Sequence, residues 1–199
     1  VVKIEESEER AGGAGNVALN ISALSGVPAL VGLTGQDEAA RILKSRLTSQ
    51  GVKCAFVELA DCTTITKLRV LSRHQQLIRL DFEDGFLMDN GKHPDAEEQL
   101  LNTYKSHLAD HEVIVFSDYQ KGTLCDLPGM ITLAREQSKT IIIDPKGNDF
   151  SHYKGATLLT PNMSEFETIV GHCDNDVELV EKAEQLCQEL QLDALLITR

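Results

Sequence analysis

The sequence has no basic stretch and few cationic residues overall. Its 199 residues include 19 lysines and arginines against 31 aspartates and glutamates, which gives a formal net charge of −12. The corresponding pI is near 4.9. A protein that binds nucleic acid needs clustered cations to displace the counterions of the phosphate backbone. The composition therefore argues against nucleic acid as a partner.

Paired cysteines and long apolar runs are missing as well. The five cysteines, at positions 54, 62, 125, 173 and 187, include no Cys-x-x-Cys pair. Scattered thiols of this kind favour a reducing compartment over a disulfide framework or a zinc site. There is no signal peptide and no apolar run that would span a bilayer. We expect a soluble cytoplasmic protein that has no membrane partner.

Both ends of the chain read as interrupted elements. The chain opens without Met on the strand-like run VVKI, and it closes on the apolar run LDALLITR at residues 192–199. We interpret the sequence as a piece of a longer protein. The length allows one substantial hydrophobic core and a small appendage.

Strand-like and helix-like segments alternate from Gly26 onward. Short apolar runs predict the strands, and a period of 3.6 residues predicts the helices between them. The expected strands are 28–33, 52–59, 112–119, 139–147, 156–162 and 192–199, and the expected helices are 14–25, 37–51, 93–109, 124–138, 163–171 and 174–191. This alternation predicts an α/β fold with a mostly parallel sheet flanked by helices.

The stretch TITKLRVLSRHQQLIRLDFE, residues 64–83, departs from this rhythm and predicts a β-hairpin. Its strands, 64–72 and 76–83, alternate with period two. Lys67, Arg69 and Arg79 share a charged face, while apolar residues form the opposite face. Two interpretations stay open: a hairpin that covers a ligand with one face, and a plain amphipathic edge hairpin.

Polar residues follow three of the predicted buried strands. Because the carboxyl ends of parallel strands meet at one edge of a sheet, these residues are expected to lie together. Acids beside lysines suit a site for phosphate and a divalent cation. The candidates are Asp118, Lys121, Asp144, Lys146, Asn162 and Glu165.

Purely structural roles are open for several of these residues. The run NMSE, residues 162–165, fits a capping box in which Asn162 caps a helix and Glu165 reaches back. Asp118 and Asp144 are also suited to cap turns. The capping interpretation is compatible with a ligand site, since a helix start attracts anions through its amides and dipole.

The small residues in EERAGGAGNVALN, residues 8–20, match the loose G-x-G-x-x-A dinucleotide pattern. That pattern must directly follow a buried strand, and here a charged run from Glu5 to Arg10 precedes it. The dinucleotide interpretation therefore fails on context. Two interpretations remain: backbone that lies close against a small polyol, and a tight turn that needs glycine.

Taken together, these motifs resemble the ribokinase-like (PfkB) carbohydrate kinases. The resemblance rests on AGGAGNVA (residues 11–18), the hairpin sequence, SDYQKG (117–122), IIIDPKG (141–147) and LLTPNMSEFE (158–167), and it covers essentially the whole chain. Within that family the sequence is most similar to the heptose 7-phosphate kinases. In many bacteria such a kinase is the N-terminal half of a bifunctional protein that also makes ADP-heptose for lipopolysaccharide.

The resemblance implies a three-layer ribokinase-like fold with a small β lid. Lid strands would lie near residues 1–10 and 64–83, and the α/β core would span about 12–60 and 93–199. The implied ligands are ATP, Mg²⁺ and a sugar phosphate, and the implied assembly is a homodimer formed through the lid.

The resemblance also assigns roles to residues. The sugar phosphate would contact Gly12, Gly13, Asn16, Asp118 and Lys121. The charge and alternation of the hairpin, and not the resemblance, predict that Lys67, Arg69 and Arg79 contact its phosphate. The nucleotide would contact Asp144, Lys146, Asn162, Met163, Ser164, Glu165 and Thr198, with Glu165 reaching Mg²⁺ through water.

One family motif is missing. The catalytic base of such kinases is an Asp in a Gly-Ala-Gly-Asp motif, and this sequence does not contain that motif. The expected base would lie downstream of these residues, and the 199 residues alone are expected to be inactive. A related sugar or sugar-phosphate kinase and a non-catalytic sugar-binding module remain as alternatives.

Overall fold

Two separate hydrophobic cores divide the chain. The computed structural model describes residues 4–72, 75–83, 93 and 95–199. It forms a first unit, Val1–Phe86, and a second unit, Leu87–Arg199. Each unit has its own core, so each one holds its own elements in place.

The first unit begins with two helices and a pair of parallel strands. These are α1 (Gly13–Ala23), β1 (Ala29–Gly35), α2 (Glu38–Ser49) and β2 (Lys53–Leu59), and β1 pairs in parallel with β2. Its core centres on Ala18, Leu47 and Val52. Asp37 caps helix α2: its carboxylate accepts a hydrogen bond of 2.9 Å from the Ala40 amide, so that one free amide of the first turn is satisfied.

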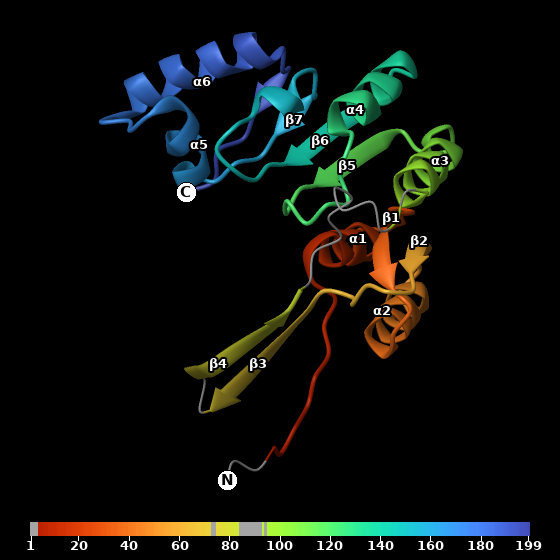
Figure 1. Cartoon of the computed structure of the whole chain (residues 1–199). Helices are drawn as coiled ribbons and strands as arrows, with labels where there is room; N and C mark the ends of the chain where they lie inside the picture. The colour runs from red at the N-terminus through yellow and green to blue at the C-terminus, as the bar shows by residue number, and fades with distance from the viewer. Residues whose placement is uncertain (1–3, 73–74, 84–92, 94) are drawn as a thin grey trace. The chain divides into compact units, whose positions relative to one another are not determined.

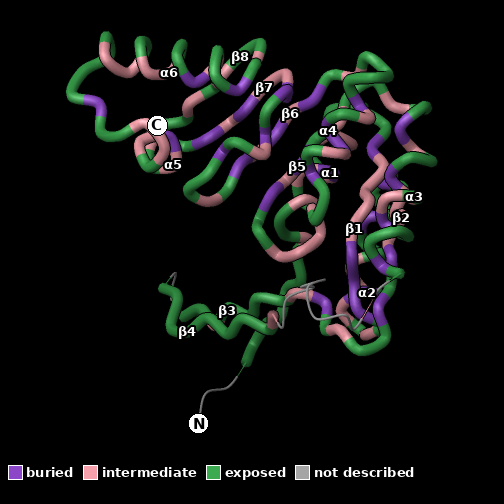
Figure 2. The backbone as a smooth tube through the Cα atoms, turned by 45° about the horizontal axis from the view of Figure 1, so that its top comes forward, coloured by how far each residue is buried: buried purple, intermediate pink, exposed green. Residues whose placement is uncertain are grey.

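The predicted hairpin is present in the first unit. Strands β3 (Thr66–Ser72) and β4 (Gln75–Phe82) are antiparallel, and Lys67 lies opposite Asp81 while Arg69 lies opposite Arg79. Residues 73 and 74 of the predicted connection lie outside the described residues. Figure 2 shows most of the hairpin as exposed, in contrast to the buried stretches of β1.

Gly35 ties the hairpin to β1. Its amide donates a hydrogen bond of 2.9 Å to the Thr64 hydroxyl, and the Thr64 amide donates one of 2.7 Å to the Asp37 carboxylate. A Cβ at position 35 would lie 2.2 Å from the Cys62 carbonyl oxygen. Glycine is therefore required at position 35 by this close approach to the segment that leads into β3.

The second unit is a parallel sheet with helices. Its elements are α3 (Ala96–Leu108), β5 (Val113–Ser117), α4 (Leu127–Glu136), β6 (Thr140–Asp144), the 3₁₀ turn η2 (Ser151–Tyr153), β7 (Leu158–Leu159), α5 (Met163–Val170), α6 (Asp176–Leu190) and β8 (Ala194–Leu195). The strands pair in the order β5-β6-β7-β8, and every pair is parallel. Figure 1 shows β5, β6 and β7 following one another across this sheet. All four carboxyl ends therefore lie along one edge.

The core of the second unit joins the sheet to its helices. Ile141 and Ile143 alternate along β6, and both are fully buried. They belong to one cluster with side chains from the helices and from η2, among them Leu108, Ile131, Tyr153 and Phe166. This core fixes the strand ends that carry the candidate site.

The predicted first lid strand is wrong for the residues that the structure describes. Residues 4–12 form neither helix nor strand before α1, while residues 1–3 lie outside the description. The run from Glu5 to Arg10 has no alternation of apolar and polar residues, so it offers no apolar face to bury.

Among the described residues, no helix combines the length and the apolar character needed to cross a membrane.

The last two strands are shorter than predicted. Pro161 follows β7 closely and has no amide to donate to a sheet ladder. Isolated pairing nevertheless continues, because the Thr198 amide donates to the Pro161 carbonyl at 3.0 Å and Asn162 bridges to Thr198. Thr198 is therefore held beside the start of α5.

Candidate functional site

A polar cleft of about 260 Å³ opens at the carboxyl edge of the sheet in the second unit. Segments that follow β5, β6, β7 and β8 form its walls. The lining residues are Asp118, Tyr119, Asp144, Pro145, Lys146, Thr160, Asn162, Glu165 and Thr198. Six of the predicted site residues therefore meet in one place, because the parallel strands deliver their carboxyl ends to the same edge.

An ion pair crosses the cleft between Lys146 and Glu165. The ammonium Nζ lies 2.7 Å from Glu165 Oε1. The hydrogen bond to Glu165 raises the pKa of Lys146. Burial acts to raise the pKa of Glu165, but the hydrogen bonds from Lys146 and from the Asn162 amide outweigh it and lower that pKa. Both groups are thus held in their charged forms.

The capping box predicted for residues 162–165 is present. Asn162 Oδ1 accepts from the Glu165 amide at 2.9 Å, and Glu165 Oε2 accepts from the Asn162 amide at 3.0 Å. One Glu165 oxygen therefore serves the cap and the other serves Lys146. The cap fixes Glu165 in the cleft, so the structural interpretation is confirmed and is compatible with a ligand role, which stays a prediction.

Asp144 lies among negative charges. Burial raises its pKa, the carboxylates of Glu165 and Asp118 raise it further, and Lys146 opposes them. A carboxylate in this position is favoured in its charged form when a cation approaches. The cleft therefore combines one ammonium group suited to phosphate with carboxylates suited to a cation.

Direct metal coordination finds no support in the described part of the chain. No group of three or more His, Cys, Asp or Glu side chains lies close enough there to hold an ion. The carboxylates and Lys146 instead suit a divalent cation that arrives with phosphate oxygens and water as its other ligands. The role of Glu165 toward a metal through water stays a prediction.

Asp118, which sequence reasoning assigned to the sugar-phosphate side, lines the same cleft as the nucleotide candidates. It is nearly buried, with 8% of its surface exposed. Its carboxylate accepts hydrogen bonds of 2.7 Å from the Gln120 amide and from the Tyr153 hydroxyl. Asp118 was predicted to contact the sugar phosphate, but it lies among the residues predicted to contact the nucleotide.

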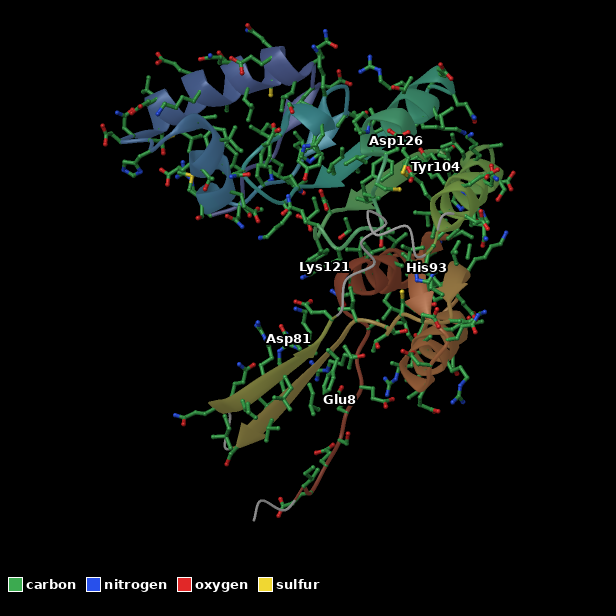
Figure 3. The ribbon with its side chains drawn as sticks, viewed as in Figure 1. Glu8, Asp81, His93, Tyr104, Lys121 and Asp126 are labelled. Atoms are coloured by element: carbon green, nitrogen blue, oxygen red, sulfur yellow. The ribbon has the colours of Figure 1, made fainter. Side chains whose placement is uncertain are left out.

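Three predicted residues of the second unit are not part of the cleft lining. Lys121 lies in the loop after β5 (Figure 3). Met163 packs against the core, and its amide donates to the Thr198 carbonyl at 2.9 Å. The Ser164 carbonyl accepts from the Thr168 hydroxyl. Any role of these residues toward a ligand stays a prediction.

The predicted sugar residues lie at the start of α1 in the first unit. Gly12 is the N-cap and has an extended backbone, without a side-chain cap. No atom lies within 4 Å of the position that a Cβ of Gly12 would take, and Asn16 is exposed on the first turn. This open backbone suits the close approach of a ligand, and no contact among the described residues explains the need for glycine at position 12.

The charged face of the hairpin is partly neutralised by its own acids. Lys67 Nζ lies 3.2 Å from Asp81 and 3.6 Å from Glu83, and Arg79 Nε lies 2.9 Å from Asp81; Figure 3 labels Asp81 on β4. Within the described ranges, Arg69 has no ion pair, and it faces Arg79 directly across the hairpin. Like charges opposite one another are unfavourable, so this pair of arginines is the part of the face best suited to an anion.

Sequence reasoning missed Tyr153, Thr160 and Tyr119. Thr160 and Tyr119 lie next to predicted residues at the strand ends, so their place at the end of a predicted strand could have identified them. Tyr153 is 35 residues from Asp118 in the sequence and lies in a short 3₁₀ turn. No local pattern pointed to it.

Comparison with known proteins agrees with this architecture. The model of the pfkB family carbohydrate kinases matches residues 1–199. The chain is 53% identical to the bifunctional protein HldE of Nitrosococcus oceani and 54% identical to that of Proteus mirabilis, in each case over the whole chain and 41% of the relative. The chain thus spans about two fifths of the length of these curated relatives.

Solved structures show the same fold. Phosphofructokinase-2 from Escherichia coli has a TM-score of 0.71 and 20% identity, over 98% of this chain and 66% of that one. A PfkB protein from Polaromonas has a TM-score of 0.72 and 15% identity, over 98% of this chain and 70% of that one. The fold is ribokinase-like, and the chain belongs to the pfkB family of carbohydrate kinases.

Proposed function

We propose that the protein transfers the γ-phosphoryl group of Mg·ATP to O1 of D-glycero-D-manno-heptose 7-phosphate. The observation that carries the proposal is the cleft in which Lys146, Glu165, Asp144 and Asp118 meet at the carboxyl edge of the sheet. Identity above 50% to bifunctional HldE proteins over the whole chain supports a role as a sugar kinase of that kind, and the choice of this substrate rests on the resemblance of the sequence motifs to the heptose 7-phosphate kinases. The product would feed the making of ADP-heptose for lipopolysaccharide in the cytoplasm.

In this proposal the cleft receives the ATP phosphates. Mg·ATP supplies the phosphoryl group, and its Mg²⁺ would neutralise part of the negative charge on the phosphates. Lys146 would offset phosphate charge and exchange its contact with Glu165 for one with a phosphate oxygen. Glu165 would then accept hydrogen bonds from metal-bound water, while Asn162 keeps it in place. Phosphoryl transfer depends on such positioning and charge stabilisation.

Asp144 and Thr198 would line the same phosphate path in this proposal. Asp144 adds negative charge close to Glu165 and so favours a cation there. Thr198 lies beside Asn162 through their backbone bridge. Both residues would help to orient the phosphates and would take no part in proton transfer.

Residues of the first unit would contact the sugar phosphate. Gly12, Gly13 and Asn16 would contact hydroxyl groups of the sugar. Arg69 and Arg79 would bind its phosphate, which relieves the repulsion between them. Arg79 would exchange its contact with Asp81 for the phosphate, while Lys67 is held by two carboxylates, Asp81 and Glu83. Asp118 and Lys121 would serve the side of the sugar that accepts the phosphoryl group.

The catalytic base is not assigned to any of these 199 residues. The Gly-Ala-Gly-Asp motif that carries it in such kinases is missing from the sequence. We therefore propose that the isolated chain is inactive and that turnover needs the full-length gene product. Added sugar phosphate and ATP should give no turnover above background with residues 1–199 alone.

A second copy of the chain is the proposed partner of the hairpin. Leu68, Ile78, Leu80 and Phe82 share its apolar face, and each is 42–49% exposed. An apolar sheet face of this kind is stabilised when it is covered. Leu80→Asp should convert a dimer into monomers in sedimentation velocity, whereas Leu24→Asp, at an exposed site on the same unit, should not.

The experiment for the proposed function measures ATP consumption by the full-length gene product. Heptose 7-phosphate, ribose and fructose 6-phosphate are offered in parallel. Turnover with the heptose phosphate alone supports the proposal. Preference for another sugar would identify a related sugar kinase, and saturable sugar binding without turnover would identify a binding module.

A further inference from the structure

The loops after β5 and β6 are linked by a buried phenol. The Tyr153 side chain is fully buried, and its hydroxyl lies 2.7 Å from Asp118 Oδ2 and 3.0 Å from the Lys146 carbonyl oxygen. The Lys146 amide donates to the same hydroxyl at 2.9 Å. A phenol has one proton, and the carboxylate is both the nearer and the stronger acceptor. Tyr153 therefore donates to Asp118 and accepts from Lys146.

Gln120 completes the link from the other side. Its amide donates to Asp118 Oδ1 at 2.7 Å, and its side-chain Nε2 donates to the Lys146 carbonyl at 3.3 Å. Gln120 has a positive φ of 53°, a conformation that costs energy for a residue other than glycine. Gly147 has a φ of +98°, and a Cβ there would lie 2.3 Å from Gln120 Nε2. We call Asp118, Gln120, Lys146 and Tyr153 the clasp.

The clasp acts on the group that faces the cleft. Tyr153 holds the Lys146 amide and Gln120 holds the Lys146 carbonyl. The Cα of Lys146, from which the side chain extends, is therefore fixed in position. From that point Nζ reaches Glu165 on α5 at 2.7 Å. We propose that Tyr153 is a positioning residue, which holds Asp118 and the Lys146 backbone so that the Lys146 ammonium is aimed into the cleft. This inference rests on the proposed function only where it concerns turnover.

Tyr153→Phe tests the clasp, and Tyr104→Phe is its matched control. Tyr104, on α3 (Figure 3), is another buried tyrosine of the same unit, and its hydroxyl donates to the Met130 carbonyl at 3.0 Å. Each change removes one buried hydroxyl, but Tyr104 contacts neither Asp118 nor Lys146 in any hydrogen bond of the described chain. In the full-length protein, Tyr153→Phe should lower kcat about 10- to 100-fold, since a small displacement of a catalytic group has effects of that size. The KM for heptose 7-phosphate should change less, and Tyr104→Phe should leave kcat within about twofold.

Hydrogen exchange reports on the clasp without any turnover. Exchange at residues 118–121 and 144–147 should become faster in Tyr153→Phe and stay unchanged in Tyr104→Phe. Equal exchange of these segments in both variants would overturn the proposal, and so would equal kcat. If the wild-type protein phosphorylates no sugar, the proposed function fails while the exchange result still decides the clasp.

The wild-type protein offers a second test in case Tyr153→Phe does not fold. Lys146 is an exposed residue, yet its amide donates to a buried hydroxyl. That amide should exchange about 100-fold more slowly than the amide of Asn148, an exposed residue of the same loop. Exchange at the same rate at both positions would contradict the clasp.

Discussion

The hairpin and the cleft both pair cationic side chains with carboxylates, but the side chains in the two regions are held in place to different degrees. On the hairpin, Lys67 and Arg79 pair with Asp81 at a surface where each cation remains more than a third exposed. In the cleft, Lys146 is also exposed, at 51% of its side chain, but its partner Glu165 is 16% exposed and is held by a helix cap, and Asp118 is held by a buried phenol. Exposed ion pairs contribute about 0–1 kcal/mol in either region, so the difference lies in the cap and in the buried hydrogen bonds of Asp118, which fix geometry. The hairpin can therefore adjust to a ligand, and the cleft is arranged before a ligand arrives.

Among the predicted changes, removal of the Lys146 ammonium should lower activity the most, and it tests the role of the cleft. Lys146→Met keeps much of the side-chain length but leaves the phosphates without their cation. We expect kcat/KM for ATP to fall about 100-fold in the full-length protein, as for loss of one preorganised charge-stabilising group. Lys182→Met is the control, because Lys182 also pairs with a glutamate, Glu178, at 2.8 Å but lies on α6. Equal losses of kcat/KM in both variants would contradict the assignment of the ATP phosphates to the cleft.

The hairpin should show a smaller effect that depends on the residue. Arg69→Ala removes the cation that has no ion pair in the described chain, and Lys67→Ala removes one that is already paired. Because a hydrogen bond to a charged group contributes about 1.5–3 kcal/mol, Arg69→Ala should raise the KM for heptose 7-phosphate at least about tenfold. Lys67→Ala should raise it much less. A larger effect at Lys67 would contradict the view that the Arg69–Arg79 pair binds the phosphate.

The pH dependence of stability should give the smallest effect and should carry opposite signs at two aspartates. The pKa of Asp144 is raised in the folded state by burial and by Glu165, so stability falls as pH rises from the unfolded pKa through the folded one. Asp144→Asn should therefore raise the thermal midpoint at pH 7 and change little near about pH 3, below the usual pKa of aspartate.

Asp149 provides the contrast for that measurement. The Ser151 amide lowers its pKa, so its contribution to stability is present above the unfolded pKa and is lost as pH falls through the folded one. Asp149→Asn should lower the midpoint at pH 7. Thermal unfolding at both pH values measures the two signs, and the same sign at both sites would refute the electrostatic account of Asp144.

Much of the fold follows from local patterns. The alternation of apolar runs and periodic helices predicted every α-helix that the structure describes, to within a few residues, as well as the hairpin. Asn162 and Glu165 were readable as a capping box because all its contacts lie within four residues. The first lid strand was wrong for residues 4–10, since a charged run without alternation offers nothing to pack.

The candidate site was readable only in part. The strand ends that meet at one edge follow from parallel pairing, so Asp118, Asp144 and Lys146 were predictable as neighbours. The partners of Lys67 on the hairpin depend on side-chain conformations that alternation does not specify. Tyr153 reaches Asp118 across 35 residues of sequence, and only the folded core brings the two together.

Hydrogen exchange of the full-length protein with each ligand in turn tests the division between the two regions most directly. A non-hydrolysable ATP analogue with Mg²⁺ should slow exchange at residues 144–147 and 162–165 and leave residues 66–82 unchanged. Heptose 7-phosphate should slow exchange at residues 66–82, with its largest effect near Arg69 and Arg79. The reverse pattern, or a nucleotide effect confined to the hairpin, would contradict the assignment of the cleft to the ATP phosphates.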